Sequence, residues 1–495
     1  MATVPEGNFA GWLVSRLGRH AYLIDAATGL TIEPAAVPGL IAGYGAAFRG
    51  AGLHAGEHVL IGGSLSPLTC LAYLGAIYAG LVVVPVEERT LATAGATLVE
   101  VTRAKAVWTE QKGSFDWLRQ ARVPGLHGDL TGGSPQPQAP AARRDADVAA
   151  LMATSGSTGV PRFVRVTHGN LRANTEAIAR SQGLREDERA MLVLPLSYCF
   201  GASVVHTHLA QGGGVVFDRR FMFPDKVLQA MAHHRCTTFA GVPTAFHVLL
   251  QRSKLRSMEF PHLRRLLQAG GALARPAIEE VRRAVPTARL YVMYGQTEAT
   301  ARITCLAPER LDDKAGSVGR PLDNLAVRIV NEQGEELPPG QIGEIRVKGP
   351  SVCAGYFDDP IETGRVFQDG WLCTRDLGQM DAEGFLWIQG RRGAFLKMRG
   401  QRVSFAEVEA QVAALPGVLE CAAQAVAHPE SGEALALLVV PKEGARLAWD
   451  QMRPRLPAHW SFDSVRFVPE LPKTANGKLS RAALAQQLKA DRGAS

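Results

Sequence analysis

The chain has 495 residues, of which 46% are hydrophobic, 20% charged and 7% aromatic. This composition is typical of a folded globular protein and excludes a disordered chain, a collagen-like repeat and a small disulfide scaffold. Lysine and arginine exceed aspartate and glutamate by 54 − 47 = 7. Acidic and basic residues are interleaved, however, so a nucleic-acid-binding surface is the least favoured interpretation. The seven cysteines are scattered without a Cys-x-x-Cys pair, which argues against a zinc site.

The sequence contains no obvious membrane or export signal. Its longest apolar stretch, residues 71–86, is interrupted by Gly75, Gly80 and Pro85 and is too short to cross a bilayer. Residues 1–10 lack a basic segment followed by an apolar run, so we expect no signal peptide. We therefore expect a cytoplasmic protein.

The first half of the chain alternates short apolar runs with helical patterns. This alternation predicts βαβ units and a parallel sheet. Residues 123–147 contain four prolines and four glycines without apolar periodicity, and we predict a surface loop there. The predicted strands are 58–62, 81–86 and 106–109, and the predicted helices are 67–79 and 91–103.

A second αβ series follows, and the pattern changes after residue 316. Residues 326–330 and 343–348 alternate apolar and polar side chains around a Gly/Pro-rich turn, which predicts a small antiparallel unit. The second series has predicted helices 168–181, 225–233 and 275–285, and predicted strands 191–194, 215–217, 266–269 and 290–293. Later predicted strands are 385–388, 395–398, 420–426, 434–440 and 464–467, with helices 405–414 and 449–456.

We thus predict an α/β protein with a large N-terminal domain of parallel-rich αβ sheets plus a small β-unit. A small mobile C-terminal α+β domain follows. The turn Gly390-Arg391-Arg392-Gly393 places the boundary, giving domains 1–390 and 391–495.

A loop rich in hydroxyls and glycines follows the apolar residues 151–153. It reads Thr154-Ser155-Gly156-Ser157-Thr158-Gly159-Val160-Pro161-Arg162. Glycines let the backbone approach an anion closely, and hydroxyls and N–H groups can surround phosphate oxygens. The loop is neither a Walker A sequence nor a G-x-S-x-G elbow. The alternative is a polar linker without a ligand.

This loop resembles the phosphate loop of the adenylate-forming superfamily, which includes acyl- and aryl-CoA synthetases, peptide-synthetase adenylation domains and luciferases. The resemblance continues in order along nearly the whole chain, so it does not depend on one motif. The further matching segments are 194–198, 241–244, 269–272, Tyr294-Gly295-Gln296-Thr297-Glu298, 370–378, Gly390-Arg391 and 472–481, which contains Lys478.

The resemblance implies that a carboxylate attacks the α-phosphate of ATP, giving an acyl-adenylate and pyrophosphate, and that a thiol then takes the acyl group. Lys478 would bring positive charge to the reacting anions, Glu298 would hold Mg²⁺, and Thr297 would contact the α-phosphate. The pyrophosphate would be bound by Thr154, Ser155, Gly156, Ser157, Thr158, Gly159 and Arg162. The nucleoside would be bound by Gly270, Gly271, Ala272, Tyr294, Gly295, Gln296, Asp376 and Arg391.

The residues that would line the acid pocket indicate a plain carboxylic acid, acyl or aryl. Relatives that activate α-amino acids carry an Asp in a Phe-Asp-x-Ser pattern, where this chain has Phe200-Gly201-Ala202-Ser203. A glycine cannot neutralise a buried ammonium group. The expected pocket residues are Tyr198, Phe200, Gly201, Val242 and Thr244, and simple core packing is the alternative for the apolar ones.

Three positions depart from the family pattern: Arg375 and Phe163 stand where glycine is common, and Gly393 occupies a hinge position. Coenzyme A or carrier-protein phosphopantetheine are the thiol acceptors implied, and the oligomeric state stays open. Two other functions remain as alternatives. In the first, the protein would pass the adenylate to an amine or stop at the adenylate. In the second, it would be a non-catalytic nucleotide-binding protein that kept the fold.

Overall fold

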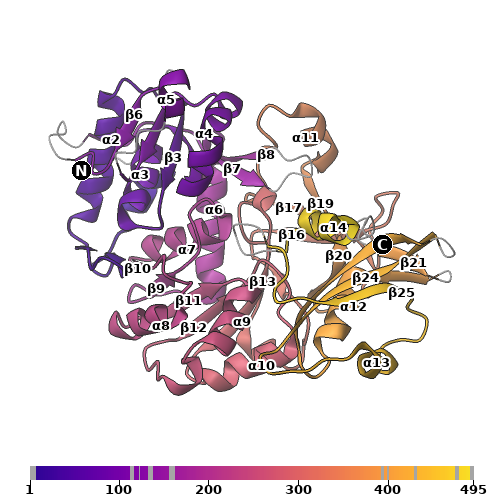
Figure 1. The fold of residues 1–495 in the computed structure, drawn as a ribbon. Helices are drawn as coiled ribbons and strands as arrows, with labels where there is room; N and C mark the ends of the chain where they lie inside the picture. Colours follow the sequence, from indigo (N-terminus) through magenta and orange to yellow (C-terminus); the bar gives the residue numbers. More distant parts are fainter. Residues whose placement is uncertain are drawn as a thin grey trace.

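The computed structural model describes residues 7–111, 116–121, 123–131, 138–154, 162–391, 395–398, 401–428, 432–473 and 479–490. The described residues form two α/β units, a small antiparallel sheet and a C-terminal unit, which follow the colour gradient of Figure 1 from indigo to yellow. The C-terminal unit lies beside the antiparallel sheet and helix α10 (Arg275–Ala284). None of the described helices has the length and hydropathy needed to cross a membrane.

The first sheet has six strands in the order β6-β5-β3-β4-β7-β8, of which only β8 runs antiparallel to its neighbour. Its central strands are covered on both faces, because Val59 packs in one core cluster with helix α3 and Leu60 in another with α4. The strands are β3 (His58–Gly63), β4 (Val82–Glu87), β5 (Ala106–Thr109), β6 (Gly125–His127), β7 (Val148–Thr154) and β8 (Arg162–Thr167). The helices are α1 (Phe9–Val14), α2 (Val37–Gly50), α3 (Pro67–Tyr78), α4 (Glu88–Thr102) and α5 (Asp116–Ala121).

The prediction that residues 123–147 form only a loop is wrong at its start, because strand β6 adds to the edge of this sheet. Val107, Trp108 and Thr109 pair in parallel with residues 125–127. The sequence hid this strand because it is three residues long and contains a glycine. Residues 132–137 of the predicted loop lie outside the described residues.

The second sheet has nine strands in the order β15-β14-β13-β12-β11-β9-β10-β1-β2. The six strands from β13 to β1 are parallel, and antiparallel strands close both edges. The strands are β1 (Leu23–Asp25), β2 (Thr31–Ile32), β9 (Arg189–Leu192), β10 (Gly214–Phe217), β11 (Thr238–Gly241), β12 (Arg265–Gln268), β13 (Arg289–Tyr294), β14 (Thr304–Leu306) and β15 (Arg320–Pro321). The helices are α6 (His168–Gln182), α7 (Cys199–Ala210), α8 (Pro224–His233), α9 (Pro243–Arg252) and α10.

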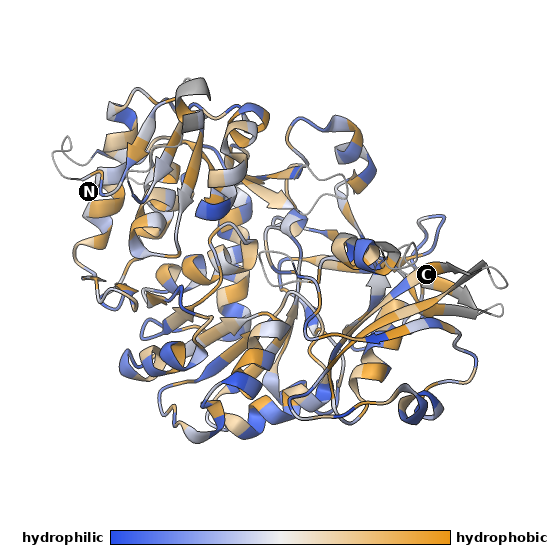
Figure 2. Cartoon of the chain, viewed as in Figure 1, coloured by the Kyte–Doolittle hydropathy of each residue, from blue (hydrophilic) through white to orange (hydrophobic). Residues whose placement is uncertain are grey.

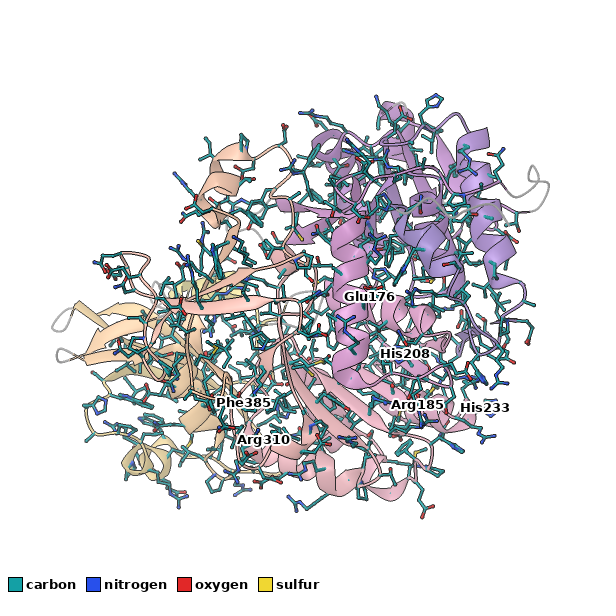
Figure 3. The ribbon with its side chains drawn as sticks, turned by 180° about the vertical axis from the view of Figure 1, so that it is seen from behind. Glu176, Arg185, His208, His233, Arg310 and Phe385 are labelled. Carbon is teal, nitrogen blue, oxygen red and sulfur yellow. The ribbon has the colours of Figure 1, made fainter. Side chains whose placement is uncertain are left out.

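A small antiparallel sheet then joins the second unit through an aromatic ring surrounded by cations. Phe385 is buried, and the cationic groups of Arg310, Lys314 and Arg320 lie 4.5, 4.8 and 4.4 Å from its ring centre. Figure 3 shows Arg310 and Phe385 next to each other at this junction. The strands are β16 (Ala326–Val330), β17 (Gly343–Lys348), β18 (Phe367–Gln368), β19 (Trp371–Met380) and β20 (Leu386–Arg391), with helix α11 (Pro360–Val366).

The C-terminal unit is built on a three-stranded sheet that is buried on both faces. Leu435, Leu437 and Val439 of β24 pack in one cluster, whereas Ala436 and Leu438 pack with helix α14 in another. This alternation follows from the two-residue period of a strand. The strands are β21 (Phe395–Met398), β22 (Gln401–Ser404), β23 (Val418–His428), β24 (Gly432–Pro441) and β25 (Phe462–Phe467). The helices are α12 (Phe405–Ala413), α13 (Trp449–Met452) and α14 (Arg481–Ala490).

The two α/β units share one hydrophobic core. Trp108 and Tyr73 of the first unit belong to the same buried cluster as Leu192 and Phe217 of the second. Figure 2 shows the hydrophobic residues gathered on the central strands and on the inner sides of the helices. The predicted fold class, a large parallel-rich N-terminal part followed by a small C-terminal α+β part, is confirmed.

We expect the buried ion pair at the amino end of the second sheet to contribute strongly to its stability. The Glu188 side chain has no solvent exposure, and its carboxylate accepts from Arg265 at 2.5 Å and from Arg264 at 3.1 Å. Glu188→Ala should lower the free energy of unfolding by about 3–5 kcal/mol, because the buried Arg265 loses its partner. Urea unfolding followed by far-UV circular dichroism measures this.

The matched control is the exposed pair of Arg180 and Asp323, whose side chains are 54% and 55% exposed. Asp323→Ala should change the free energy of unfolding by about 1 kcal/mol or less. Equal effects of the two substitutions would contradict the assignment of Glu188 to a buried ion pair.

Candidate active site

The predicted site residues lie on loops that follow neighbouring parallel strands. Strands β9, β11, β12 and β13 are adjacent and parallel, so their carboxyl ends meet at one edge of the sheet. In open α/β sheets, this edge is where ligands bind. The structure therefore brings together four segments that are distant in sequence: 194–198 after β9, 242–244 after β11, 269–272 after β12 and 294–298 after β13.

Tyr294, Asp376 and Arg391 form a connected group at this edge. The Tyr294 hydroxyl donates to Asp376 Oδ2 at 2.5 Å, and Arg391 Nε donates to Asp376 Oδ1 at 3.2 Å. Burial and the neighbouring carboxylate raise the pKa of Tyr294, so its phenol stays protonated as a donor. The Asp376 carboxylate raises the pKa of Arg391. Three residues that we assigned to the nucleoside are thus in direct contact.

Glu298 is supported by a residue that the sequence reasoning missed. The Tyr356 hydroxyl donates to Glu298 Oε1 at 2.8 Å, and the Glu298 carbonyl accepts from the Cys353 N–H at 2.9 Å. Burial, followed by the Glu298 charge, raises the pKa of Tyr356. Because Tyr356 lies 58 residues away and is placed by a bridge to Val164 of β8, no local pattern pointed to it.

Thr297 and Gln296 occupy the same segment and are half-buried. The Thr297 hydroxyl donates to Cys199 Sγ at 3.6 Å, which links this segment to the start of helix α7. Gln296 Nε2 is shielded from solvent and has no hydrogen-bond partner among the described residues. A buried amide without a partner is costly, and a bound ligand would satisfy it.

Gly295 is required by the close approach of two backbone segments. A Cβ atom added there would lie 1.9 Å from the Ala301 carbonyl oxygen. The backbone N–H of Ile303 donates to the Tyr294 carbonyl at 2.9 Å, so the segment cannot move away without breaking this bond. The glycine of the Tyr-Gly-x-Thr-Glu motif is explained by packing.

The loop 270–272 is held by its own strand. Gln268 Nε2 donates to the Gly271 carbonyl at 2.7 Å, and Gly270 has a φ of +88°, where glycine is unstrained. Gly271 and Ala272 are exposed. Gly271 faces Pro243, the first residue of helix α9, because an added Cβ would lie 3.3 Å from its ring.

The residues expected in the acid pocket lie at the starts of helices α7 and α9. Tyr198, Phe200 and Val242 are buried, and Thr244 is half-buried. The backbone of Gly201 packs on the preceding segment, since an added Cβ would lie 2.3 Å from the Pro195 carbonyl oxygen. Close packing is therefore a sufficient reason for this glycine, whatever the substrate.

Sequence reasoning also missed Arg302, which lies four residues after Glu298 and is only 2% exposed. Its guanidinium lies 4.6 Å from the centre of the Phe200 ring. Burial lowers the pKa of Arg302, and the groups that oppose this shift are Cys305, Tyr198 and Cys199. A charged residue within an otherwise apolar and hydroxyl-rich segment was the available signal.

Several expected residues are outside the described residues: Ser155, Gly156, Ser157, Thr158, Gly159, Gly393 and Lys478. The described residues next to these two loops form backbone pairs. Thr154 pairs with Arg162 across β7 and β8, and Lys473 pairs with Leu479 in an antiparallel bridge. Arg162 lies 3.4 Å from Asp359 and 3.7 Å from Glu362.

The structure shows how Arg375, which stands where glycine is common, is accommodated beside Asp376. It adopts a φ of +61°, which glycine adopts without strain, at an irregular point of the β17–β19 pairing. Its side chain pairs with the nearly buried Glu362 at 2.7 Å. This ion pair provides compensation for the strained backbone. Phe163, at the second departure, is a buried strand residue of β8.

We expect Gly295→Ala to disturb this site and to lower the free energy of unfolding by about 1–3 kcal/mol, as overpacking does. Gly364→Ala in helix α11 is the matched control, because an added Cβ there meets no atom within 4 Å. That control should be neutral or stabilising by up to about 1 kcal/mol. Thermal and urea unfolding measure both, and an unchanged Gly295→Ala protein would contradict the packing argument.

Comparisons with known proteins identify the family. Residues 40–357 match the AMP-binding enzymes, and residues 407–478 match the AMP-binding enzyme C-terminal domain. A feruloyl-CoA synthase from an Amycolatopsis species is 33% identical over 448 residues, which cover 87% of this chain and 89% of the relative.

Solved structures agree with this assignment. ATP-bound MatB from Rhodopseudomonas palustris is 27% identical with a TM-score of 0.88, covering 97% of this chain and 99% of that one. The amide bond synthetase McbA from Marinactinospora thermotolerans is 25% identical with a TM-score of 0.87 and the same coverages. The predicted resemblance is confirmed, and the chain belongs to the AMP-binding enzyme family.

Proposed function

We propose that the protein activates a carboxylic acid with ATP and transfers the acyl group to the thiol of coenzyme A. The observation that carries the proposal is the group of Tyr294, Asp376 and Arg391 beside Glu298 at the carboxyl edge of the sheet. The buried Gln296 amide, which lacks a partner among the described residues, lies in the same segment. The feruloyl-CoA synthase relative supports coenzyme A as the acceptor.

In the first step, a carboxylate oxygen of the acid attacks the α-phosphorus of ATP. The new P–O bond forms as the bond to the bridging oxygen breaks, and pyrophosphate leaves with that electron pair. Two anions react, so catalysis depends on positive charge placed between them. We assign this role to Lys478, while Thr297 contacts the α-phosphate.

The nucleoside would be held by the residues already in contact. Asp376 can accept hydrogen bonds from the ribose hydroxyls, Arg391 adds positive charge, and Tyr294 would stack on adenine beside the loop 270–272. Pyrophosphate would be bound by the loop from Thr154 to Arg162.

Glu298 would hold the Mg²⁺ that neutralises phosphate charge. Among the described residues no cluster of three metal-ligating side chains exists. One carboxylate together with phosphate oxygens is a usual environment for this ion.

In the second step, a thiolate attacks the acyl carbon, the thioester bond forms, and AMP leaves. We propose that residues 391–495 act as a lid that rotates between the steps, bringing Lys478 in for the first and residues 396–403 for the second. Transfer to carrier-protein phosphopantetheine or, as the name of McbA suggests for that relative, to an amine are the competing second steps.

Pyrophosphate exchange with a panel of carboxylic acids tests the first step, and product detection with coenzyme A, a carrier protein and simple amines tests the second. We propose a plain acid as the substrate, because the charged pocket neighbour Arg302 would repel an ammonium group. Exchange that is fastest with an α-amino acid would contradict this. Absence of exchange with every acid would favour the non-catalytic alternative.

Lys478→Ala should lower the rate of pyrophosphate exchange by about 100-fold or more, because one charge at the reacting phosphate is lost. The matched control is Lys473→Ala, which removes a lysine that pairs with Glu420 at 3.0 Å on the same segment. The control should keep its rate within about threefold. Full exchange by Lys478→Ala would overturn the mechanism.

Asp376→Asn should raise the KM for ATP by about 10-fold to 100-fold, because hydrogen bonds to a charged group contribute about 1.5–3 kcal/mol. The amide keeps the acceptor for the Tyr294 hydroxyl but loses the charge opposite Arg391. Initial rates at varied ATP measure the effect, and the melting temperature reports any general loss of stability. An unchanged KM would remove Asp376 from the nucleotide site.

A further inference from the structure

Arg302 is a buried cation that has no anionic partner among the residues the structure describes. The residue is 2% exposed, and its Nε has no hydrogen-bond partner among the described residues. No carboxylate of the described residues forms an ion pair with it, and the groups that act on its charge are thiols and a phenol. Its backbone is fixed by Asn174, which bonds to the Arg302 N–H and carbonyl at 3.3 and 3.0 Å.

Arg265 of strand β12 is also nearly buried, and its contacts are those of an arginine with a structural role. It donates to Glu188 at 2.5 Å and to the carbonyls of Gln182 and Gly183 at 3.0 and 2.7 Å. Its charge is neutralised and its donors are used. Because a buried unpaired charge is costly, a fold keeps one when a ligand provides the opposite charge.

The surroundings of Arg302 also favour an anion. Its guanidinium packs over Phe200 in the first turn of the twelve-residue helix α7, whose N-cap residue Tyr198 provides no side-chain cap. The amino end of a helix carries partial positive charge, which disfavours a cation and attracts an anion. Two independent positive features therefore meet at this place.

The position of Arg302 separates it from the reacting phosphate. Cys199 receives the hydrogen bond of Thr297, and Arg302 packs on the next residue, Phe200. Ala301 and Cys199 also line a small cavity with Ala202 and Ser203. Arg302 thus belongs to the acid side of the site, beyond the residues assigned to the α-phosphate.

We propose that Arg302 binds a second anionic group of the acid, at the end opposite to the carboxylate that reacts. The substrate class is then a dianionic acid, such as a dicarboxylate, whose second oxyanion receives the guanidinium donors in a charge-assisted pair. This inference rests on the proposed activation of an acid. It adds that the pocket selects for charge as well as for shape.

The test compares acids that differ only in the second charge. Malonate, succinate and glutarate are compared with propionate, butyrate and pentanoate, and terephthalate with benzoate, in pyrophosphate exchange by the full-length protein. We expect the dianion to exceed its monoanionic partner by roughly 100-fold in kcat/KM in at least one pair. Arg302→Met should remove that preference, so that the ratio of kcat/KM for the dianion to kcat/KM for the monoanion falls to about one.

Control variants distinguish a loss of the dianion preference from a general loss of stability. Arg302→Lys keeps the charge and should retain part of the preference, whereas Arg265→Met should lower the melting temperature without changing the ratio. Should Arg302→Met not fold, Arg302→Lys and Arg302→Gln decide by the same ratio. Two results would overturn the role of Arg302. The first is a preference of the native protein for the monoanion, and the second is a dianion preference that these variants leave unchanged.

If no acid supports exchange, the proposed function fails, and the Arg302 site is still measurable. The same dicarboxylates should raise the melting temperature of the native protein more than the monocarboxylates do, and this difference should vanish in Arg302→Met. An equal response of the two proteins would overturn the site in the absence of activity.

Discussion

The Asp376 carboxylate is the group on which the arrangement of the site depends. It is nearly buried, and such a charge needs partners that come to it from elsewhere in the chain. Tyr294 arrives from the end of strand β13 and Arg391 from the end of β20. Through Tyr294, this carboxylate links the second sheet to strands β19 and β20 of the antiparallel sheet, in addition to the contacts around Phe385.

The same constraint explains the residues around Asp376. Its backbone N–H is bonded to the Thr374 hydroxyl at 3.1 Å, and the strand is irregular at this point, so that Arg375 takes a positive φ. Arg375 then pairs with Glu362, which also lies within reach of Arg162. A series of ion pairs therefore runs from Arg375, the residue before Asp376, through Glu362 to Arg162 at the start of β8.

The strands that the sequence predicted are those in which the burial of each residue follows from its position along the strand. Val82–Val86 is apolar because both faces of that strand are covered, and residues 345–348 alternate because Ile345 and Val347 are buried whereas Lys348 is exposed. Strand β6 was missed because its pairing with strand β5, and not its composition, makes it a strand. Edge strand β8 was missed because it is a strand through its antiparallel pairing with β7, on the other side of the loop.

Contiguous segments of the candidate site, such as Tyr294 to Glu298, could be singled out from the sequence alone. The site was not predictable where a contact depends on tertiary placement. Tyr356 reaches Glu298 from a bridge to strand β8, and the glycine at position 201 is required by the nearby carbonyl of Pro195. Such residues carry no periodic signal, because their neighbours in space are remote in sequence.

The excess of positive charge in the composition has little bearing on the site. Many surface arginines are already paired, such as Arg282 with Asp312 and Arg264 with Asp187. Surface pairs are screened by water and contribute little, so their number does not indicate a ligand. Arg302 is different because water cannot solvate it and no described carboxylate neutralises it. A single cation in that position has more influence on which anion the protein binds than the net charge of the whole chain, because its interaction is not weakened by solvent.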